Sequence, residues 1–343
     1  MADIATRESL ALKIYAETLT AFERKNVFME LVTKQTINGG KSAQFIVDTR
    51  GVEANVAGIV AGTAGTVGAN ALNSGVVRTH NLGVDSRTLA SDILVGERTI
   101  TVERPKVIRK NIDDFDAQIV PYNTRTIATG QMGRSMASYV DQRVIYELDK
   151  AMVATALVDS NNGSIEVQDT ATNIFNADIK TGGTAGTREA KGDALVETLF
   201  YGVGELDGKD QTGYERVFVT NNENYYNLLL SQKAVNRDFN AGDNGSIADG
   251  NVFRIGDVMI LRSNSLYAGL LTNTLAQVGG GDEFVGFMLS KNVIGMLELK
   301  GLQTKQWMDD DYDQYIMKAT LTAGYGILNP ASLVAITTGS ENS

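Results

Sequence analysis

Four consecutive residues near the start of the chain have the types and order that phosphate binding uses. The run Gly39-Gly40-Lys41-Ser42 matches the end of a P-loop, in which backbone N–H groups and a lysine hold phosphate oxygens. The full motif needs a further glycine five positions before Gly40, where this chain has Gln35, and it needs a helix to follow. The residues after Ser42 are instead typical of a strand. The sequence therefore does not favour a nucleotide site here.

Two other features could hold a metal ion. The single histidine, His80, has no cysteine or second histidine to share a transition metal with. The acidic run from Asp309 to Asp313 alternates carboxylates as a calcium loop does, but Gln314 and Thr320 occupy the positions of that loop's glycine and closing glutamate. We expect no metal and no cofactor, a surface histidine and a solvated turn, with a fortuitous divalent site at the acidic run as the alternative.

Catalytic groups are not indicated either. One histidine cannot support a Ser/His/Asp arrangement, and the absence of cysteine removes a thiolate nucleophile, a thiolate zinc site and any disulfide. A pair of catalytic carboxylates remains open because the chain has 41 Asp and Glu residues, but nothing distinguishes one pair from another. We predict that the protein is not an enzyme. A hydrolase or metal-dependent enzyme is an alternative that would need a deep pocket with converging polar groups.

The composition limits the class of protein. With 343 residues, 43% hydrophobic and 21% charged, we expect a folded chain of two domains or of one domain with large excursions. The lack of cysteine suits a reducing cytosol, and no apolar run is long enough to span a membrane. A net charge of −10 argues against non-specific binding of nucleic acid.

The strongest helical pattern runs over residues 124–157. Its apolar residues recur at three- and four-residue spacing: Ile127, Met132, Met136, Tyr139, Val140, Val144, Leu148, Ala151 and Met152. Its expected charged rim is Arg134, Asp141, Arg143, Glu147 and Lys150. At ~1.5 Å per residue this helix would be about 50 Å long and would need other segments to cover it. Gly130 and Gly133 lie in its first turns, where each costs about 1 kcal/mol of helix propensity relative to alanine.

Shorter patterns surround this helix. We expect a helix at 8–25, a strand at 41–47, a second amphipathic helix near 194–206 and a small α/β unit at 216–283. Residues 48–105 have few positions for a core of their own, so we expect them to lie on another copy of the chain. The chain has no internal repeat, which disfavours a tail or fibre-like binding module.

Several short motifs together resemble one family. The strongest is the run Gly40, Lys41, Ser42, Ala43, Gln44, Phe45 and Val47, with Arg50 beyond it. In chain order there follow Ile112, Asp113, Asp116, Tyr122, Arg125, Val217, Phe218, Gly245, Ser246, Ile247, Asn292, Val293, Ile294, Gly295, Leu328 and Pro330. This order, over residues 10–336, resembles the major capsid proteins of T-seven-like short-tailed bacteriophages.

The resemblance implies an α+β fold, the HK-ninety-seven-like capsid fold of tailed phages. Its parts would be an N-terminal arm at 1–45, an extended loop at 46–104, a peripheral domain at 105–215 with the spine helix at 124–157, an axial domain at 216–283, and a return to the peripheral domain at 284–343. The stretch 57–83 departs from the family in being longer and richer in Gly and Ala than its loop tip.

The resemblance also implies a function and partners. Members form hexamers and pentamers that close into an icosahedral shell around packaged DNA, without binding it specifically. The partners would be other copies, a scaffolding protein, a portal and possible decoration proteins, with no membrane. The location would be the virion capsid, assembled in the host bacterial cytoplasm.

Two further expectations concern the shell. Some relatives of this fold join subunits through a Lys–Asn isopeptide bond on the extended loop, but residues 46–104 contain no lysine, so we predict a non-covalent shell. We also expect Gly130 and Gly133 to act as a hinge that absorbs a bend of the spine helix when the shell expands.

Overall fold

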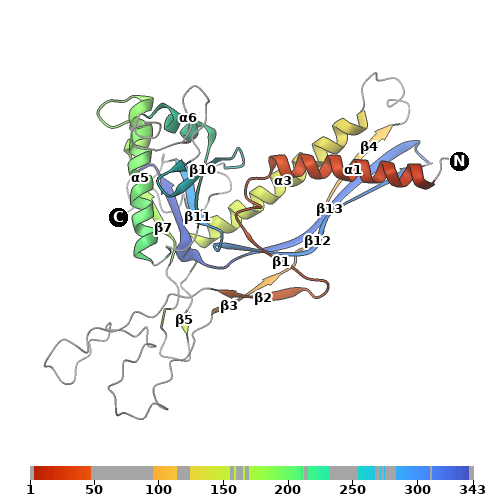
Figure 1. Ribbon diagram of the computed structural model, residues 1–343, viewed down its shortest axis with the longest axis horizontal. Coiled ribbons are helices and arrows are strands. Elements are labelled where there is room, and N and C mark those ends of the chain that lie inside the picture. The colour runs from red at the N-terminus through yellow and green to blue at the C-terminus, as the bar shows by residue number, and fades with distance from the viewer. Residues whose placement is uncertain are drawn as a thin grey trace, which may run out of the picture.

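The computed structural model gives the chain an elongated body of two β-sheets and three long helices, from which a narrow hairpin projects (Figure 1). The structure describes residues 4–47, 96–113, 124–154, 158–159, 165–166, 170–209, 211, 215–231, 254–266, 271, 274, 283–309 and 311–339. None of the described helices is both long and apolar enough to cross a membrane.

The predicted spine helix is present as α3, Thr124–Ala151, and it crosses the middle of the body (Figure 1). The side chains of its apolar stripe that are at most 1% exposed include Met132, Met136, Val140, Val144 and Leu148. Helix α1, Ile4–Lys25, lies along the N-terminal part of α3 and covers one side of it. Burial of the stripe against other segments therefore stabilises α3, as expected for a helix of this length.

The spine helix ends earlier than predicted, at Ala151 rather than at residue 157. Its last turn tightens, since the N–H of Val153 donates to the carbonyl of Lys150, three residues back, at 3.2 Å. Val153 is also 54% exposed, so the apolar stripe no longer faces a core there.

A four-stranded sheet packs against α3. Its order is β1 (Thr33–Thr36), β12 (Ile294–Asp309), β13 (Gln314–Ile327) and β4 (Lys106–Asp113). Alternate residues of β13 belong to the core around α3: Met317, Ala319, Leu321, Ala323 and Tyr325. Because side chains alternate across a strand, the intervening residues of β13 face away from α3.

A six-stranded sheet forms the other half of the body. Its order is β7 (Thr172–Phe175), β14 (Leu333–Thr337), β11 (Phe284–Ser290), β8 (Arg216–Thr220), β10 (Val258–Arg262) and β9 (Arg254–Ile255). One face joins the core around α3 through Val217, Val219, Phe287, Leu289, Leu333 and Ala335. The other face joins a second core through Phe218, Val285, Met288, Val334 and Ile336. This sheet is therefore buried on both faces, which explains why its central strands are continuous apolar runs.

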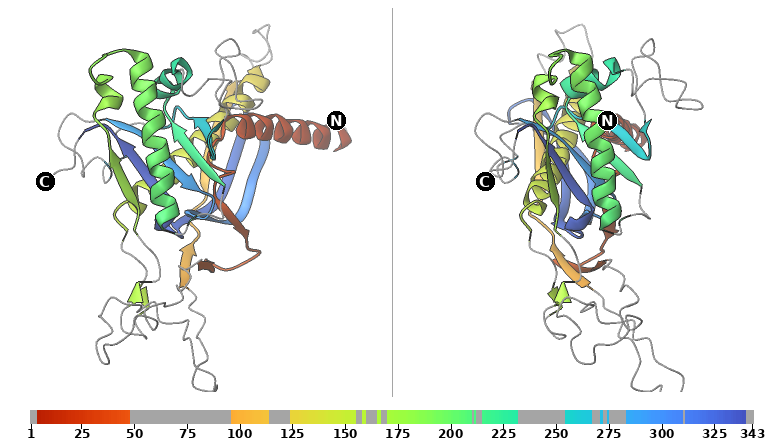
Figure 2. Two further views of the ribbon diagram at one scale, coloured as in Figure 1. Left: turned by 60° about the vertical axis from the view of Figure 1, so that its left-hand side comes forward. Right: turned by 90° about the vertical axis from the view of Figure 1, so that its left-hand side faces the viewer.

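Helices α5 (Arg188–Gly208) and α6 (Asn222–Leu230) cover the face of this sheet that points away from α3 (Figure 2). Both begin where the sequence supplies a cap. The hydroxyl of Thr187 accepts from the N–H of Ala190, and the side chain of Asn221 accepts from the N–H of Asn224.

The remaining described elements are small. The strands β2 (Ser42–Val47) and β3 (Gly96–Thr101) form a separate two-stranded hairpin. The others are β5 (Val158–Asp159), β6 (Ile165–Glu166), α4 (Asp178–Thr181) and the short turn of 3-10 helix η5 (Pro330–Ser332).

This arrangement confirms a mixed α+β fold, but some elements lie elsewhere than the predicted boundaries place them. Helix α5 falls within residues 105–215, assigned to the unit of the spine helix, yet it packs on the six-stranded sheet. Strands β11 and β14 fall within the return segment 284–343 and also belong to the six-stranded sheet. The reason is long-range strand pairing: β11 lies between β8 and β14, and it pairs with both.

Candidate assembly surfaces

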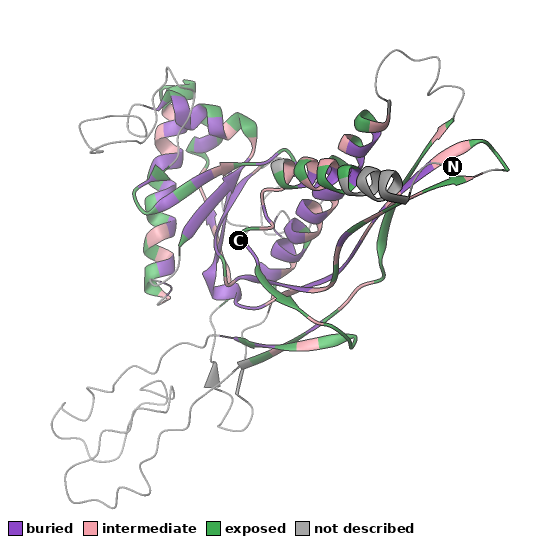
Figure 3. Cartoon of the chain, turned by 45° about the vertical axis from the view of Figure 1, so that its right-hand side comes forward, coloured by how far each residue is buried: buried purple, intermediate pink, exposed green. Residues whose placement is uncertain are grey.

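The hairpin of β2 and β3 projects from the body and is mostly exposed (Figure 3). Its two strands pair antiparallel, from Ser42 opposite Thr101 to Val47 opposite Gly96. One face is anchored, because Phe45 and Ile100 pack with other buried side chains against the body. The cluster is Phe45, Val47, Ile100, Leu297 and Leu328. The other face is open, and its Ile46 is 79% exposed.

Glycines of the four-stranded sheet let this hairpin approach closely. A Cβ atom on Gly324 would lie 2.1 Å from the carbonyl oxygen of Thr101, and one on Gly326 would lie 2.9 Å from the side chain of Ile100. Gly295 is similarly crowded by Ile100, at 2.7 Å. These glycines therefore set the position of the hairpin base on the outer face of the sheet, opposite α3.

We expect Gly324→Ala to displace the hairpin base. The new methyl group would overlap a backbone oxygen that cannot rotate away, and overpacking of this kind costs about 1–3 kcal/mol. Urea unfolding of the unassembled subunit measures the loss. Gly39→Ala is the matched control, because a Cβ there meets nothing within 4 Å. Equal stability of both variants would show that the hairpin does not depend on this contact.

An ion-pair network joins the segment after the hairpin to the spine helix. The Nε of Arg143 donates to Oε1 of Glu103 at 2.8 Å, and its Nη2 lies 2.6 Å from the same oxygen. Nη2 also lies 2.7 Å from Oε1 of Glu147, one turn further along α3. Lys106 reaches Glu103 at 3.7 Å. Arg143, Glu103 and Glu147 are partly or almost fully buried, whereas Lys106 is exposed, so the pairs of Arg143 are stronger than an exposed pair. They attach the segment between β3 and β4 to α3.

The motif residues lie at the start of this hairpin, and the structure explains their types. Gly40 has φ +95, a conformation that glycine adopts without strain. Lys41 follows it, and its carbonyl accepts from the N–H of Val102 at 2.7 Å. Ser42, Ala43, Gln44 and Phe45 then form β2. A strand follows the glycines where a P-loop needs a helix, and Arg50 lies outside the described residues.

The two candidate hinge glycines differ in their surroundings. A Cβ on Gly133 would lie 2.4 Å from the carbonyl oxygen of Thr18 and 2.8 Å from Cβ of Ala21, both on α1. A Cβ on Gly130 would meet nothing within 4 Å. Gly133 is therefore a point of close approach between α1 and α3, a role that spacing alone did not indicate. The proposed hinge stays a prediction.

Asp141 anchors the turn that follows α1. It was expected on the charged rim of the spine helix, but it is only 1% exposed. Its Oδ1 accepts from the backbone N–H groups of Val27 and Phe28, each at 3.2 Å. Burial raises the pKa of Asp141 to about 6, although these two bonds and nearby Lys25 act in the opposite direction. The prediction that Asp141 lies on the charged rim of α3 was wrong, because residues 27–28, which are distant in sequence, cover this side of the helix.

The candidate metal ligands form no site in the described part of the chain. His80 and Asp310 lie outside the described residues, and no group of three potential ligands occurs within them. Asp309 instead closes a turn by accepting from the N–H of Asp311 at 3.3 Å. The tip of the β12–β13 hairpin also exposes large apolar side chains, which the sequence analysis did not single out: Trp307, Met308 and Tyr312.

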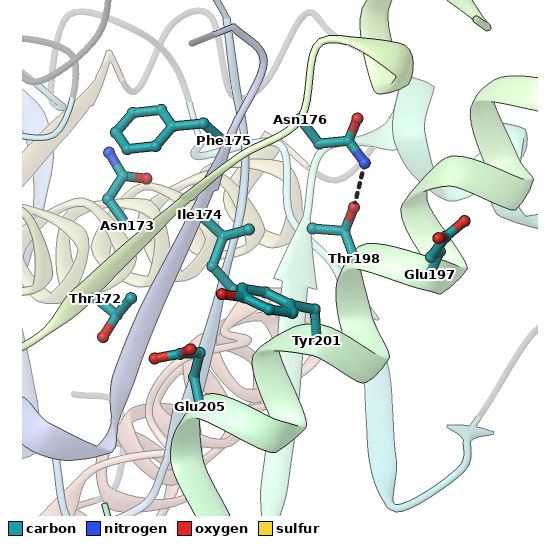
Figure 4. Close-up of a pocket in the computed structure, with 9 residues that line it drawn as sticks. All are labelled: Thr172, Asn173, Ile174, Phe175, Asn176, Glu197, Thr198, Tyr201 and Glu205. Atoms are coloured by element: carbon teal, nitrogen blue, oxygen red, sulfur yellow. Dashed lines mark hydrogen bonds between the residues drawn. The ribbon is translucent and has the colours of Figure 1, made fainter. Parts of the chain in front are cut away.

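A groove of about 680 Å³ lies between strand β7 and helix α5 (Figure 4). Its lining is Thr172, Asn173, Ile174, Phe175, Asn176, Glu197, Thr198, Tyr201 and Glu205. Two carboxylates, hydroxyls and amides line it, and Nζ of Lys209 donates to the hydroxyl of Thr172 at its edge. It is an open surface groove, so it does not favour the enzyme alternative.

Comparisons with known proteins agree with this picture. The chain is 26% identical to the major capsid protein of Enterobacteria phage T3 over 350 residues, which cover 97% of this chain and 92% of that protein. Among solved structures, the capsid of cyanophage P-SCSP1u aligns with a TM-score of 0.63 at 22% identity, covering 92% of this chain and 89% of that one. The mature capsid of bacteriophage PhiM1 aligns with a TM-score of 0.59 at 17% identity, covering 93% and 88%.

These structural similarities confirm the HK-ninety-seven-like fold of tailed-phage capsid proteins. The family model for the Gp10A-like major capsid proteins matches residues 80–337, which extend from before β3 to the end of β14. Because this match spans most of the chain, the protein belongs to the Gp10A-like family of phage major capsid proteins, as the motifs at residues 40–50 and beyond predicted.

Proposed function

We propose that copies of this chain assemble into hexamers and pentamers, which close into an icosahedral shell around packaged phage DNA. The protein acts as a structural component of the virion and not as an enzyme. The observation that carries this proposal is the β2–β3 hairpin. Its base is locked onto the chain's own sheet, while its outer face, with Ile46 79% exposed, has no cover among the described residues. A neighbouring copy would supply that cover.

The two halves of the body fit the two domains of such a subunit. We assign the four-stranded sheet with α1 and α3 to the peripheral domain and its arm, and the six-stranded sheet with α5 and α6 to the axial domain. The shared core around α3 supports a rigid connection between them, since side chains from both sheets pack in it. Packing of this kind lets a subunit transmit force between neighbours without unfolding.

In this proposal the shell encloses DNA without binding it specifically. A net charge of −10 supports this, because a negative wall repels phosphate within a Debye length of about 8 Å. A scaffolding protein, a portal and decoration proteins are the further partners, and assembly takes place in the host bacterial cytoplasm.

We expect assembled particles to dissolve in SDS into single chains. Residues 46–104 contain no lysine to form an isopeptide bond with a neighbour, so many non-covalent interfaces hold the shell. Denaturing gel electrophoresis of boiled and unboiled particles is the measurement. A ladder of dimers, hexamers or pentamers after boiling would contradict a non-covalent shell.

The function itself is tested by electron microscopy of the chain expressed together with a scaffolding protein. Closed particles with sixfold and fivefold clusters are the expected result. A protein that stays monomeric and compact at high concentration, with scaffold present, would overturn the proposal.

A further inference from the structure

The link between β1 and β2 (Figure 1) contains an Asn-Gly pair that the proposed shell function does not use. Residues 38–40, Asn-Gly-Gly, are all exposed in this link. At one end of it, the N–H of Ile37 donates to the carbonyl of Glu298 at 2.9 Å. At the other end, the carbonyl of Lys41 accepts from the N–H of Val102 at 2.7 Å. The link is therefore an open loop whose two ends are held.

An asparagine followed by glycine can react with its own backbone. The main-chain nitrogen of the glycine loses its proton and attacks the side-chain carbonyl carbon of the asparagine. A new C–N bond forms, the bond to the amide nitrogen breaks, and that nitrogen leaves as ammonia with the released proton. The product is a succinimide ring, which water opens at either carbonyl to give aspartate or isoaspartate. Because the reacting atoms belong to adjacent residues, their positions decide the rate.

Both reacting groups are free at Asn38. Within the described ranges, its side-chain amide has no hydrogen-bond partner, and neither has the N–H of Gly39. A Cβ atom on Gly39 would meet nothing within 4 Å, so the space around the attacking nitrogen is open. Glycine also reaches backbone conformations that other residues do not. Of the described asparagines only Asn38 precedes a glycine, because the Asn-Gly pairs at 162–163 and 244–245 lie outside the described residues.

The nearest described asparagine along the chain shows the opposite case. The amide oxygen of Asn26 accepts from the N–H of Met29 at 2.6 Å. The N–H that would attack Asn26 belongs to Val27, and it donates to Oδ1 of Asp141 at 3.2 Å. Both reacting groups are therefore occupied, and the branched side chain of valine would crowd the ring.

We propose that Asn38 is a modification site, at which the nitrogen of Gly39 closes a succinimide ring and water opens it to aspartate and isoaspartate. Either product places a carboxylate three residues before Lys41. Isoaspartate also adds one backbone carbon to a link whose two ends are held by hydrogen bonds. An ageing subunit therefore gains a negative charge at the entry to the β2–β3 hairpin. This inference goes beyond the proposed shell function and does not depend on it.

Peptide mass spectrometry of the folded, unassembled subunit after incubation in mildly alkaline buffer is the test. Trypsin cuts after lysine and arginine, so Asn38 lies in the peptide 35–41 and Asn26 lies in the peptide 26–34. We expect the peptide 35–41 to convert steadily to the acid form, divided between aspartyl and isoaspartyl products that chromatography separates. The peptide 26–34 should keep its amide.

Gly39→Ala should slow the conversion roughly tenfold, because alanine reaches fewer of the conformations that bring the nitrogen onto the carbonyl carbon. Its methyl group meets nothing within 4 Å, so we expect this variant to fold normally. Gly204→Ala is the matched control, since a Cβ there also meets nothing within 4 Å and the residue lies on α5. This control should leave the conversion unchanged. Asn38→Asp supplies the aspartyl peptide as a chromatographic standard.

Conversion of the peptide 35–41 that is no faster than that of the peptide 26–34 would overturn the proposal. An equal rate in Gly39→Ala would overturn it as well. The guanidinium-denatured chain gives the rate that the sequence alone permits, and the folded subunit should match it. A folded subunit that converts far more slowly would show that the fold protects Asn38, and the site would be refuted. Because the test uses unassembled subunits, a failure to form particles bears on the shell function alone.

Discussion

Replacing Gly133 by alanine should detach α1 from the spine helix. The added Cβ would lie 2.4 Å from the carbonyl oxygen of Thr18 and 3.0 Å from the backbone nitrogen of Phe22. Both are backbone atoms, so the helices must separate, and overpacking in such a contact costs about 1–3 kcal/mol. We expect a lower free energy of unfolding in urea and faster proteolysis within residues 4–25.

Gly130→Ala is the matched control, one turn away on the same helix. Its Cβ meets nothing within 4 Å, and alanine is favoured over glycine in a helix by about 1 kcal/mol. This variant should therefore be more stable than the unmodified chain. If Gly133→Ala is equally stabilised, the close contact with α1 does not constrain the packing of the two helices.

The same pair of variants refines the hinge hypothesis. A double Gly130/Gly133 alanine variant would combine a stiffer helix with a displaced α1, so its effect on shell expansion could not be assigned to either cause. Gly130→Ala alone changes only the stiffness of the first turns. Normal expansion of shells made from this single variant would refute a hinge at Gly130.

Asp141→Asn should stabilise the subunit at neutral pH. Burial raises the pKa of Asp141 to about 6 from 3.8, so the folded state holds its proton more tightly than the unfolded state does. The stabilisation from this group is then complete below pH ~4 and is lost as the pH rises through about 6. A shift of about two pKa units corresponds to on the order of 3 kcal/mol. Asparagine keeps an oxygen that can accept from Val27 and Phe28 but carries no charge.

Urea unfolding at several pH values between 4 and 8 measures this effect. The advantage of the Asn variant should be largest above pH 7, should be small near pH 4 and should disappear below the unfolded-state pKa of 3.8, where Asp141 is protonated in both states. Asp141→Ala is the control, because it removes the acceptor and should destabilise the turn at every pH. An Asn variant that is less stable than the unmodified chain at pH 7 would mean that the hydrogen bonds of the carboxylate outweigh the cost of its burial. The other charged groups that line the cavity at Asp141 are Lys25 and Arg262, so the profile is best measured at constant ionic strength.

Some tertiary features left no readable signal in the sequence. β12 runs over 16 residues, but register shifts near Glu298, Lys300 and Gln303 interrupt its alternation, so the sequence does not show it as one continuous strand. Strands β11 and β14 are buried on both faces and read as apolar runs, which do not reveal the sheet they join. For this reason the sequence analysis placed both strands in the return segment 284–343 by their order in the chain, and not in the six-stranded sheet by their pairing.

The sequence by itself determined the spine helix, the mixed fold and the capsid family, because a helical period and ordered short motifs are properties of neighbouring residues. Only the tertiary structure showed which residues of the spine helix hold α1 and the turn after it in place. Gly130 and Gly133 are the same residue type on the same helix, yet α1 packs closely only against Gly133. Asp141 looked like a rim charge until Val27 and Phe28, more than a hundred residues earlier, were found to cover it. Contacts between segments so far apart depend on the packing of the whole chain, which no local pattern encodes.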